Sequence, residues 1–187
     1  MNTNHHRRSI RLKHYDYAQN GAYFVTICTH ERRCFFGTIR DGEMMVNAWG
    51  QIVIEEWEQT AILRPNVALD AFVVMPNHVH GIIVMVDDGR GMMHHAPTDH
   101  APTQPPDHAP PKREFSKPIA QSLSTIIGTF KAAVTRRINR LPNASGHSIW
   151  QRNYYEHIIR NDDDLIRIRE YIETNPSRWQ QDSLFSN

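Results

Sequence analysis

The sequence predicts an α+β domain, a two-layer sandwich in which helices pack on a mainly antiparallel sheet. Short runs of β-branched and aromatic residues alternate with periodic helical segments, in an order close to βαββ, linker, αβα. The 187 residues are enough for one domain with a real core. Hydrophobic residues make up 40% of the chain and charged residues 22%, which is ordinary for a globular protein.

The first predicted elements are a strand, a hairpin and a helix. Segment 21–31, GAYFVTICTHE, is rich in β-branched and aromatic residues and predicts the first strand. A hairpin turn is indicated at Asp41-Gly42, between short apolar pieces. Asn47 can cap a helix that follows. The apolar positions of that helix recur at helical spacing at Trp49, Ile52, Val53 and Trp57.

Two apolar strands come next, LDAFVVM (69–75) and HVHGIIVMV (78–86), separated by the turn signal Pro76-Asn77. Because both are apolar on both faces, we expect both to be central strands. Segment 87–116 then repeats a His-Ala-Pro unit and predicts an extended, flexible linker. The whole chain, 1–187, is therefore expected to be a single domain with this linker inserted.

An amphipathic helix is predicted over 119–140, and its apolar stripe consists of Ile119, Leu123, Ile126, Ile127, Phe130, Val134 and Ile138. Segment 148–161 predicts a loop that leads into a short strand. Asn161 can cap a final helix whose first turn is acidic, where the helix dipole favours negative charge. Pro176 is expected to end that helix.

The overall composition excludes some classes of protein. The formal net charge is only +1, so total charge does not indicate a nucleic-acid binder, although clustered basic residues could form one positive face. Cys28 and Cys34 fit no metal or redox motif and are expected to be reduced. No apolar segment follows the basic N-terminus, so a secretory signal is not expected, and no run approaches the about 20 apolar residues of a membrane span. A cytoplasmic protein is expected.

A pair of histidines interrupts the second apolar strand. Side chains alternate along a strand, so His78 and His80 point the same way and can chelate one metal ion. A hydrogen-bonded pair at a strand end is the alternative, and a third ligand decides between the two. In the final helix, Asn175 lies one turn after Tyr171 on the inward face. A metal bound through the carbonyl oxygen of Asn175 would satisfy a buried amide, unless that residue merely terminates the helix.

Three motifs together resemble the single-tyrosine HUH transposases, and most closely the REP-associated tyrosine transposases of bacteria. They are VMPNHVH (74–80), IWQRNYYEHIIRN (149–161) and REYIETNP (169–176). The opening segment RRSIRLKHYDYAQNGAYFVTICT (7–29) is similar to the N-terminal segment of these proteins. The resemblance spans nearly the whole chain except the linker, and it implies a ferredoxin-like fold.

The resemblance also implies roles for individual residues. His78, His80 and Asn175 would bind the metal, and Tyr171 would be the catalytic nucleophile. A nitrogen-and-oxygen ligand set with open positions is compatible with Mg²⁺ or Mn²⁺. The implied enzyme is a single-strand DNA endonuclease and strand transferase that forms a covalent phosphotyrosine at hairpin-forming repeat elements.

Other interpretations stay open. A domesticated, non-catalytic protein that binds DNA hairpins is one, and a metallohydrolase acting on another phosphodiester is a second. The implied partner is single-stranded DNA with hairpin repeats, bound by a monomer or a homodimer. The resemblance also implies dimers in which the tyrosine helix can serve the partner's site, so the sequence does not decide whether Tyr171 acts within its own chain.

Each role also has rival residues. Tyr154 and Tyr155 are alternative nucleophiles, and Glu156 or His157 could replace Asn175 as the third metal ligand. Arg167, one turn before Tyr171, could balance phosphate charge. The residues expected to contact DNA through phosphates or by stacking are Arg7, Arg8, Arg11, Lys13, Lys131, Arg136, Arg137, Arg140, Arg152 and Tyr154.

Overall fold

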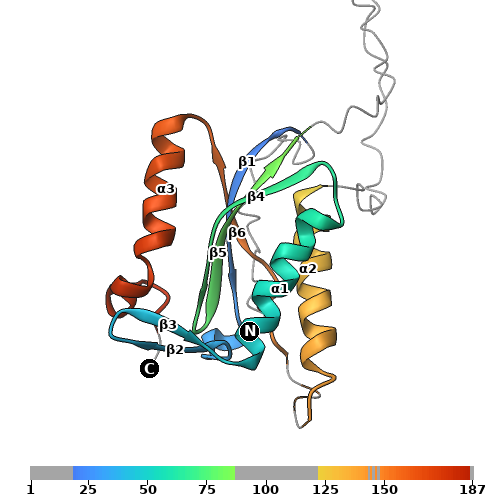
Figure 1. Cartoon of the computed structure of the whole chain (residues 1–187), viewed down its shortest axis with the longest axis vertical. Coiled ribbons are helices and arrows are strands. Elements are labelled where there is room, and N and C mark those ends of the chain that lie inside the picture. The colour runs from blue at the N-terminus through green and yellow to red at the C-terminus, as the bar shows by residue number, and fades with distance from the viewer. Residues whose placement is uncertain (1–18, 87–121, 143, 145, 147, 186–187) are drawn as a thin grey trace, which may run out of the picture.

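The computed structural model describes residues 19–86, 122–142, 144, 146 and 148–185. Its centre is a 4-stranded sheet in the order β4-β5-β1-β6 (Figure 1). The strands are β1 (Gly21–Cys28), β4 (Val67–Met75), β5 (His78–Met85) and β6 (Tyr155–Ile159). Each strand pairs antiparallel with its neighbours.

Two helices connect these strands as crossovers, α1 (Ala48–Ile62) between β1 and β4, and α2 (Leu123–Ile138) between β5 and β6. The result is a βαββαβ unit with the strand pairing of a ferredoxin-like fold. The α+β class with a mainly antiparallel sheet is therefore confirmed. Figure 1 shows α1 and α2 on one face of the sheet, and the final helix α3 (Asp162–Thr174) on the other.

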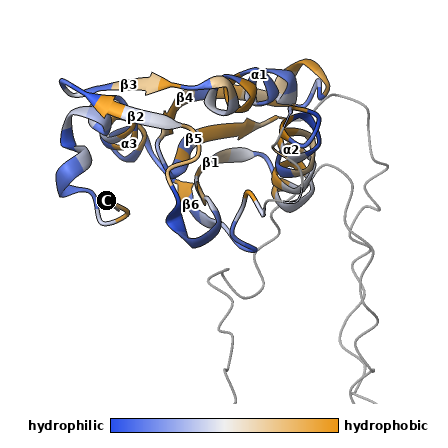
Figure 2. Cartoon of the chain, turned by 90° about the horizontal axis from the view of Figure 1, so that it is seen from below, coloured by the Kyte–Doolittle hydropathy of each residue, from blue (hydrophilic) through white to orange (hydrophobic). Residues whose placement is uncertain are grey.

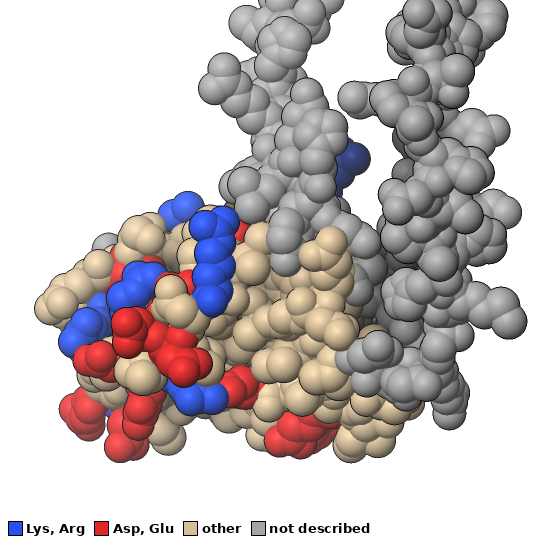
Figure 3. Space-filling view, turned by 90° about the horizontal axis from the view of Figure 1, so that it is seen from above, with Lys and Arg blue, Asp and Glu red and all other residues tan. Residues whose placement is uncertain are grey.

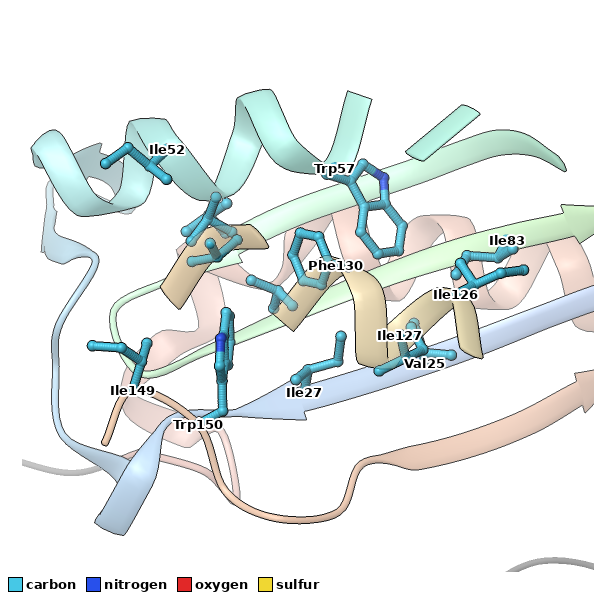
Figure 4. Close-up of a cluster of buried hydrophobic side chains, with 14 of the residues drawn as sticks. Val25, Ile27, Ile52, Trp57, Ile83, Ile126, Ile127, Phe130, Ile149 and Trp150 are labelled. Carbon is cyan, nitrogen blue, oxygen red and sulfur yellow. The ribbon is translucent and has the colours of Figure 1, made fainter. Parts of the chain in front are cut away.

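The larger core lies between the sheet and the helices α1 and α2 (Figure 4). From β1 it takes Tyr23, Val25 and Ile27, which alternate with residues that face α3. Every described position of the apolar stripe predicted for α2 is buried. Figure 2 shows the same segregation by hydropathy, with mostly hydrophobic central strands and mixed helices.

A glycine next to the histidine pair brings α1 close to the sheet. A Cβ on Gly81 would lie 2.4 Å from a ring carbon of Trp57, far inside van der Waals contact. Trp57 instead lies over Gly81 and stacks on Phe72, with ring centroids 4.5 Å apart. The HVHG sequence of β5 thus combines polar residues facing one way with a close helix contact on the other face.

The local signals for turns and helix starts are confirmed. Asp41 and Gly42 both have positive φ, 52° and 80°, as the two-residue turn between β2 (Gly37–Arg40) and β3 (Glu43–Val46) requires. Asn47 accepts hydrogen bonds from two backbone amides at the start of α1, and Asn161 accepts one in α3. The helix predicted over 119–140 begins later, at Leu123, because Ser122 is its N-cap. Ile119 lies outside the described residues.

One expectation about the sheet is wrong. β5 is central, but β4 is an edge strand. Its apolar residues are nevertheless covered on both faces, because α1 contacts one face of β4 and α3 the other. An apolar sequence on both faces therefore indicates two covering helices here and not two neighbouring strands.

The N-terminal arm and the predicted 87–116 linker lie outside the described residues. Within the described part of the chain, no helix is long and apolar enough to cross a membrane. Figure 3 shows basic and acidic side chains intermixed over the side where α3 lies, so the visible surface there is not a single positive face.

Candidate active site

The strand register gathers polar residues on the face of the sheet that α3 covers. Thr26 of β1 lies opposite His80 of β5 on one side and opposite Tyr155 of β6 on the other. His78 lies opposite Cys28, two residues farther along β1. Because directly opposite residues share a face, these side chains and Phe24 point toward α3.

Neighbouring side chains orient both imidazoles. The Asn77 amide nitrogen donates to the carbonyl oxygens of Arg32 and Leu184, at 3.2 and 2.8 Å, which fixes the amide. Its Oδ1 therefore accepts from His78 Nδ1 at 2.7 Å, so that nitrogen carries the proton and Nε2 offers a lone pair. His80 Nδ1 lies 2.8 Å from the Thr26 hydroxyl, which turns the other ring nitrogen toward His78.

The two Nε2 atoms meet at a distance of 3.0 Å. When Thr26 accepts from His80 Nδ1, both Nε2 atoms carry lone pairs, and these repel unless a proton or a cation lies between them. Two nitrogens that bind one ion at right angles, each about 2.1 Å from it, are about 3.0 Å apart. The spacing of His78 and His80 therefore fits a shared divalent cation.

Asn175 and Asp182 add oxygen atoms to this pair. Asn175 is buried at the C-terminal end of α3, and its Nδ2 donates to Asp182 Oδ2 at 3.1 Å. Its Oδ1 is buried and, among the described residues, accepts no hydrogen bond of normal geometry. Asp182 Oδ2 lies 3.9 Å from His78 Nε2, and the ligand atoms of His78, His80 and Asp182 all lie within 4.8 Å of one another.

These four residues fit a divalent cation. An orphaned buried carbonyl oxygen is costly, and a cation would satisfy it. Two imidazole nitrogens with an amide oxygen and a carboxylate oxygen suit a small divalent ion that also needs room for substrate oxygens. His78, His80, Asn175 and Asp182 would hold such an ion.

Tyr171 lies beside the histidines in the same chain. Its hydroxyl lies within hydrogen-bond distance of His80 Nε2, at 3.2 Å, and its ring centroid lies 5.1 Å from that of His80. The side chain is 41% exposed, so a polymer can reach it from solvent. No other chain is needed to bring this hydroxyl to the histidine pair.

Burial sets the electrostatics of the site. It lowers the pKa of His78 to about 4, against the opposing attraction of Asp182, and it lowers the pKa of His80 well below its usual value. Both imidazoles are therefore neutral at physiological pH, as metal binding requires. Burial and the Asp182 carboxylate raise the pKa of Tyr171, which the Asn175 amide partly offsets. The phenol therefore needs help to ionise.

Sequence reasoning missed Asp182, Asn77 and Thr26. Asp182 follows the last helix in an irregular segment, after the 3₁₀ helix η2 (Pro176–Gln181), where no periodicity indicates a direction. The sequence predicts Asn77 only as a turn residue, although its place directly before His78 is a usable signal. The contact of Thr26 with His80 depends on the register of β1 against β5, which the sequence does not state.

The alternative metal ligands, Glu156 and His157, do not lie next to the histidine pair, and Arg167 is paired with an acidic residue. His157 Nε2 lies 2.7 Å from a carboxylate oxygen of Asp164. Glu156 lies directly opposite Val25 in the strand register, and the Val25 side chain faces the larger core. The structure thus places neither next to the histidine pair. Arg167 also pairs with Asp164, so its charge is already partly balanced.

The residues expected to contact DNA are dispersed. Arg7, Arg8, Arg11 and Lys13 lie outside the described residues. Arg136, Arg137 and Arg140 belong to α2 and the turn after it, and α2 covers the face of the sheet opposite to α3. Arg137 pairs with Glu55 and Glu56 of α1, whereas Arg136 and Arg140 are exposed.

The remaining candidates lie between α2 and β6. The Lys131 ammonium donates to the backbone oxygens of Gln151 and Arg152 and so holds this loop against α2. Burial lowers the pKa of Lys131 to about 8. Tyr154 packs partly against the larger core, and Trp150 is buried in it. Arg152 is exposed. Their contacts with DNA stay predictions.

Comparisons with known proteins identify a relative and a fold. No family model matches the chain. A protein of Haemophilus influenzae (strain ATCC 51907 / DSM 11121 / KW20 / Rd), described as uncharacterized, is 42% identical over 181 residues, which cover 97% of this chain and 94% of the relative.

Two solved structures are similar in three dimensions. A REP-associated tyrosine transposase bound to a REP hairpin has a TM-score of 0.56 and 20% identity, over 90% of this chain and 73% of its own. A crystal structure of a protein from Deinococcus radiodurans R1, described as a putative transposase, has a TM-score of 0.43 and 16% identity, over 87% of this chain and 96% of its own. This similarity is too distant to carry an argument. The first comparison shows a shared fold and so confirms the fold that the sequence resemblance implies.

Proposed function

We propose, from the premise that this chain belongs to one family with the Haemophilus influenzae protein and has the fold of the REP-associated tyrosine transposase, that it nicks and rejoins single-stranded DNA. The observation that supports this most strongly is local to the site. Tyr171 is 41% exposed, and its hydroxyl lies 3.2 Å from one of two buried, neutral histidines whose Nε2 atoms converge. A binding protein needs no such arrangement.

The reaction follows from the groups present. The Tyr171 oxygen attacks the phosphorus of a phosphodiester, an O–P bond to tyrosine forms, and the bond to the 3′-oxygen of the neighbouring nucleotide breaks. The phenol proton passes to water at the exposed edge of the site, and the released 3′-oxygen is protonated there. Because the phosphotyrosine keeps the ester bond, another 3′-hydroxyl can reverse the step and join two strands.

A divalent cation, Mg²⁺ or Mn²⁺, would draw charge from the phosphate oxygens and orient the phosphorus. His78, His80 and Asn175 would hold it, together with Asp182. Thr26 and Asn77 keep the imidazoles aimed at one point, so little reorganisation is needed when the ion binds.

Arg178 is the cation best placed for the phosphate. It lies in η2, one turn after Asn175, and lines the cavities on two sides of Tyr171. Among the described residues, no carboxylate lies within 4.0 Å of its guanidinium, in contrast to Arg167 and Arg169. An unpaired guanidinium beside a nucleophile can bind phosphate oxygens in a bidentate way.

The substrate class comes from the structural relative. That transposase is bound to a REP hairpin, and we extend this kind of DNA, a hairpin with a single-stranded flank, to the present chain. Since Tyr171 meets His80 within one chain, the tyrosine is proposed to act on its own site.

A covalent-adduct assay tests the proposal. The protein is incubated with Mn²⁺ or Mg²⁺ and a pool of labelled DNA hairpins that carry random single-stranded flanks, and adducts are separated on denaturing gels. Wild-type protein should form a DNA adduct, Tyr171→Phe should form none, and Tyr155→Phe should retain it. An adduct of normal yield with Tyr171→Phe would remove Tyr171 from its role. Tight hairpin binding without any cleavage would favour the domesticated binding protein.

A further inference from the structure

A cavity opens next to the Tyr171 hydroxyl on the side of β6. Its volume is about 420 Å³, within the range of small-ligand sites, and it extends from Phe24 and Tyr171 to Tyr155, Gln151 and Asn153. His80 also lines it, so the cavity is continuous with the candidate active site. A strand whose phosphate reaches Tyr171 can therefore place a neighbouring nucleotide at this opening.

Aromatic rings form the walls of the cavity. Phe24 is buried at its floor, and the rings of Tyr155 and Tyr171 stand steeply on Phe24, at 68° and 83°, with centroids 6.3 and 6.1 Å away. Tyr155 is 46% exposed although it begins a strand of the sheet. An exposed tyrosine is often no more than a surface residue, but here Tyr155 and Tyr171 both line a cavity of about 420 Å³, in which a flat heterocycle could stack on an aromatic ring.

Two side-chain amides also line the cavity. The Gln151 and Asn153 side chains make no hydrogen bond to another described residue, so their donors and acceptors are available. The backbone of Gln151 is fixed, because its N donates to Cys28 O and its O accepts from the half-buried Lys131 ammonium. Primary amides offer the paired donor and acceptor that match the edge of a nucleobase.

A second cavity, of about 590 Å³, shares Phe24, Tyr155 and Tyr171 with the first and lies toward α3. Arg167, Arg178, His157 and Glu170 line it. Aromatic rings with free amides on one side of the nucleophile, and mainly basic side chains on the other, suit the base and the phosphate backbone of one strand. A plain apolar peptide would leave those amides and the Arg178 guanidinium unpaired.

We propose that the cavity bounded by Phe24, Tyr155 and Tyr171 holds one nucleobase of the cleaved strand, from a nucleotide that adjoins the attacked phosphate. Tyr155 stacks on the base, and Gln151 and Asn153 bind its edge. The proposal deepens the proposed function and rests on it. It makes Tyr155, Gln151 and Asn153 residues that select the cleavage site without taking part in the bond exchange.

The first test removes the base instead of the protein group. The DNA that forms the adduct is resynthesised with an abasic site at either nucleotide that adjoins the cleaved bond, and its affinity is measured with full-length Tyr171→Phe protein and Mn²⁺. At one of the two positions the loss of the base should weaken binding roughly 5- to 150-fold, the range for a base stacked on an aromatic ring. Tyr155→Ala should weaken the binding of intact DNA by a similar factor and the binding of abasic DNA hardly at all. Tyr155→Phe should bind both DNAs as the parent protein does. Equal affinity for intact and abasic DNA at both positions would overturn the proposal, as would an equal effect of Tyr155→Ala on both.

The second test needs no cleavage, so it separates failure of the pocket from failure of the nicking reaction. Random-sequence single-stranded decamers with a central 2-aminopurine are titrated with the same proteins. Stacking in the pocket should quench the fluorescence, Tyr155→Phe should retain the quenching, and Tyr155→Ala should abolish it. Quenching that is unchanged in Tyr155→Ala would contradict the proposal even if the adduct assay succeeds. Loss of quenching in Tyr155→Ala would support the pocket even if no adduct forms.

Discussion

The two faces of one sheet differ in what their strands present. On the face of α1 and α2, β1 contributes Tyr23, Val25 and Ile27 to a large apolar cluster. On the face of α3, the intervening residues Phe24 and Thr26 meet a small apolar cluster and several buried polar groups. The same alternation along one strand thus builds a stabilising core on one side and a reactive site on the other.

This difference indicates a division of labour. The larger core can hold the backbone of β1 and β5 in place, so the α3 face can carry buried imidazoles and amides that a core would not tolerate. Free energy of unfolding should therefore depend mainly on the first face, and activity on the second.

The largest expected effect on stability compares one residue type on the two faces. Ile126→Ala on α2 should lower the free energy of unfolding toward the upper end of the about 2–5 kcal/mol that such truncations cost. Ile168→Ala on α3 should fall toward the lower end, because its cluster is small and lies at the rim of the site. Chemical denaturation at pH 7 checks this. A larger loss with Ile168→Ala would contradict the division.

The pH dependence of stability should come from the α3 face. His78 has a pKa of about 4 in the folded protein and about 6.5 when unfolded, so protons bind the unfolded chain first as the pH falls. Stability is therefore complete above pH 6.5 and declines toward pH 4, by on the order of 3 kcal/mol for this residue. His80 should add to the decline, since its pKa is lowered too.

Denaturation series between pH 7.5 and about pH 4, with EDTA present to exclude metal effects, measure this decline. In the double variant His78→Gln, His80→Gln the slope should become shallower. An unchanged slope would mean that other groups carry the pH dependence.

A smaller effect should distinguish two arginines near α3. Arg178→Ala should slow adduct formation roughly 10- to 100-fold, because a hydrogen bond to a charged phosphate is lost. Arg169→Ala is the matched control, since Arg169 already pairs with Asp70 of β4 and should leave the rate unchanged. Equal rates for both variants would remove Arg178 from the site.

The sequence predicts those features of the site that depend on local periodicity. The spacing of His78 and His80 in a strand placed them on one face, and the helical spacing of Tyr171 and Asn175 placed those two together. What it could not supply is position relative to distant segments. Asp182 reaches the histidines from an irregular tail, and Thr26 does so through strand register. For the same reason, an apolar pattern could not distinguish β4, an edge strand between two helices, from a central strand.

The measurement that tests the central claim most directly is Mn²⁺ binding followed by electron paramagnetic resonance. The full-length protein should bind one Mn²⁺ in the His78, His80, Asn175 and Asp182 cluster. Affinity should fall by at least about tenfold in His80→Gln and in Asp182→Asn, and remain unchanged in Tyr171→Phe, which keeps every ligand. Undiminished Mn²⁺ binding after both histidines are replaced by glutamine would contradict the account.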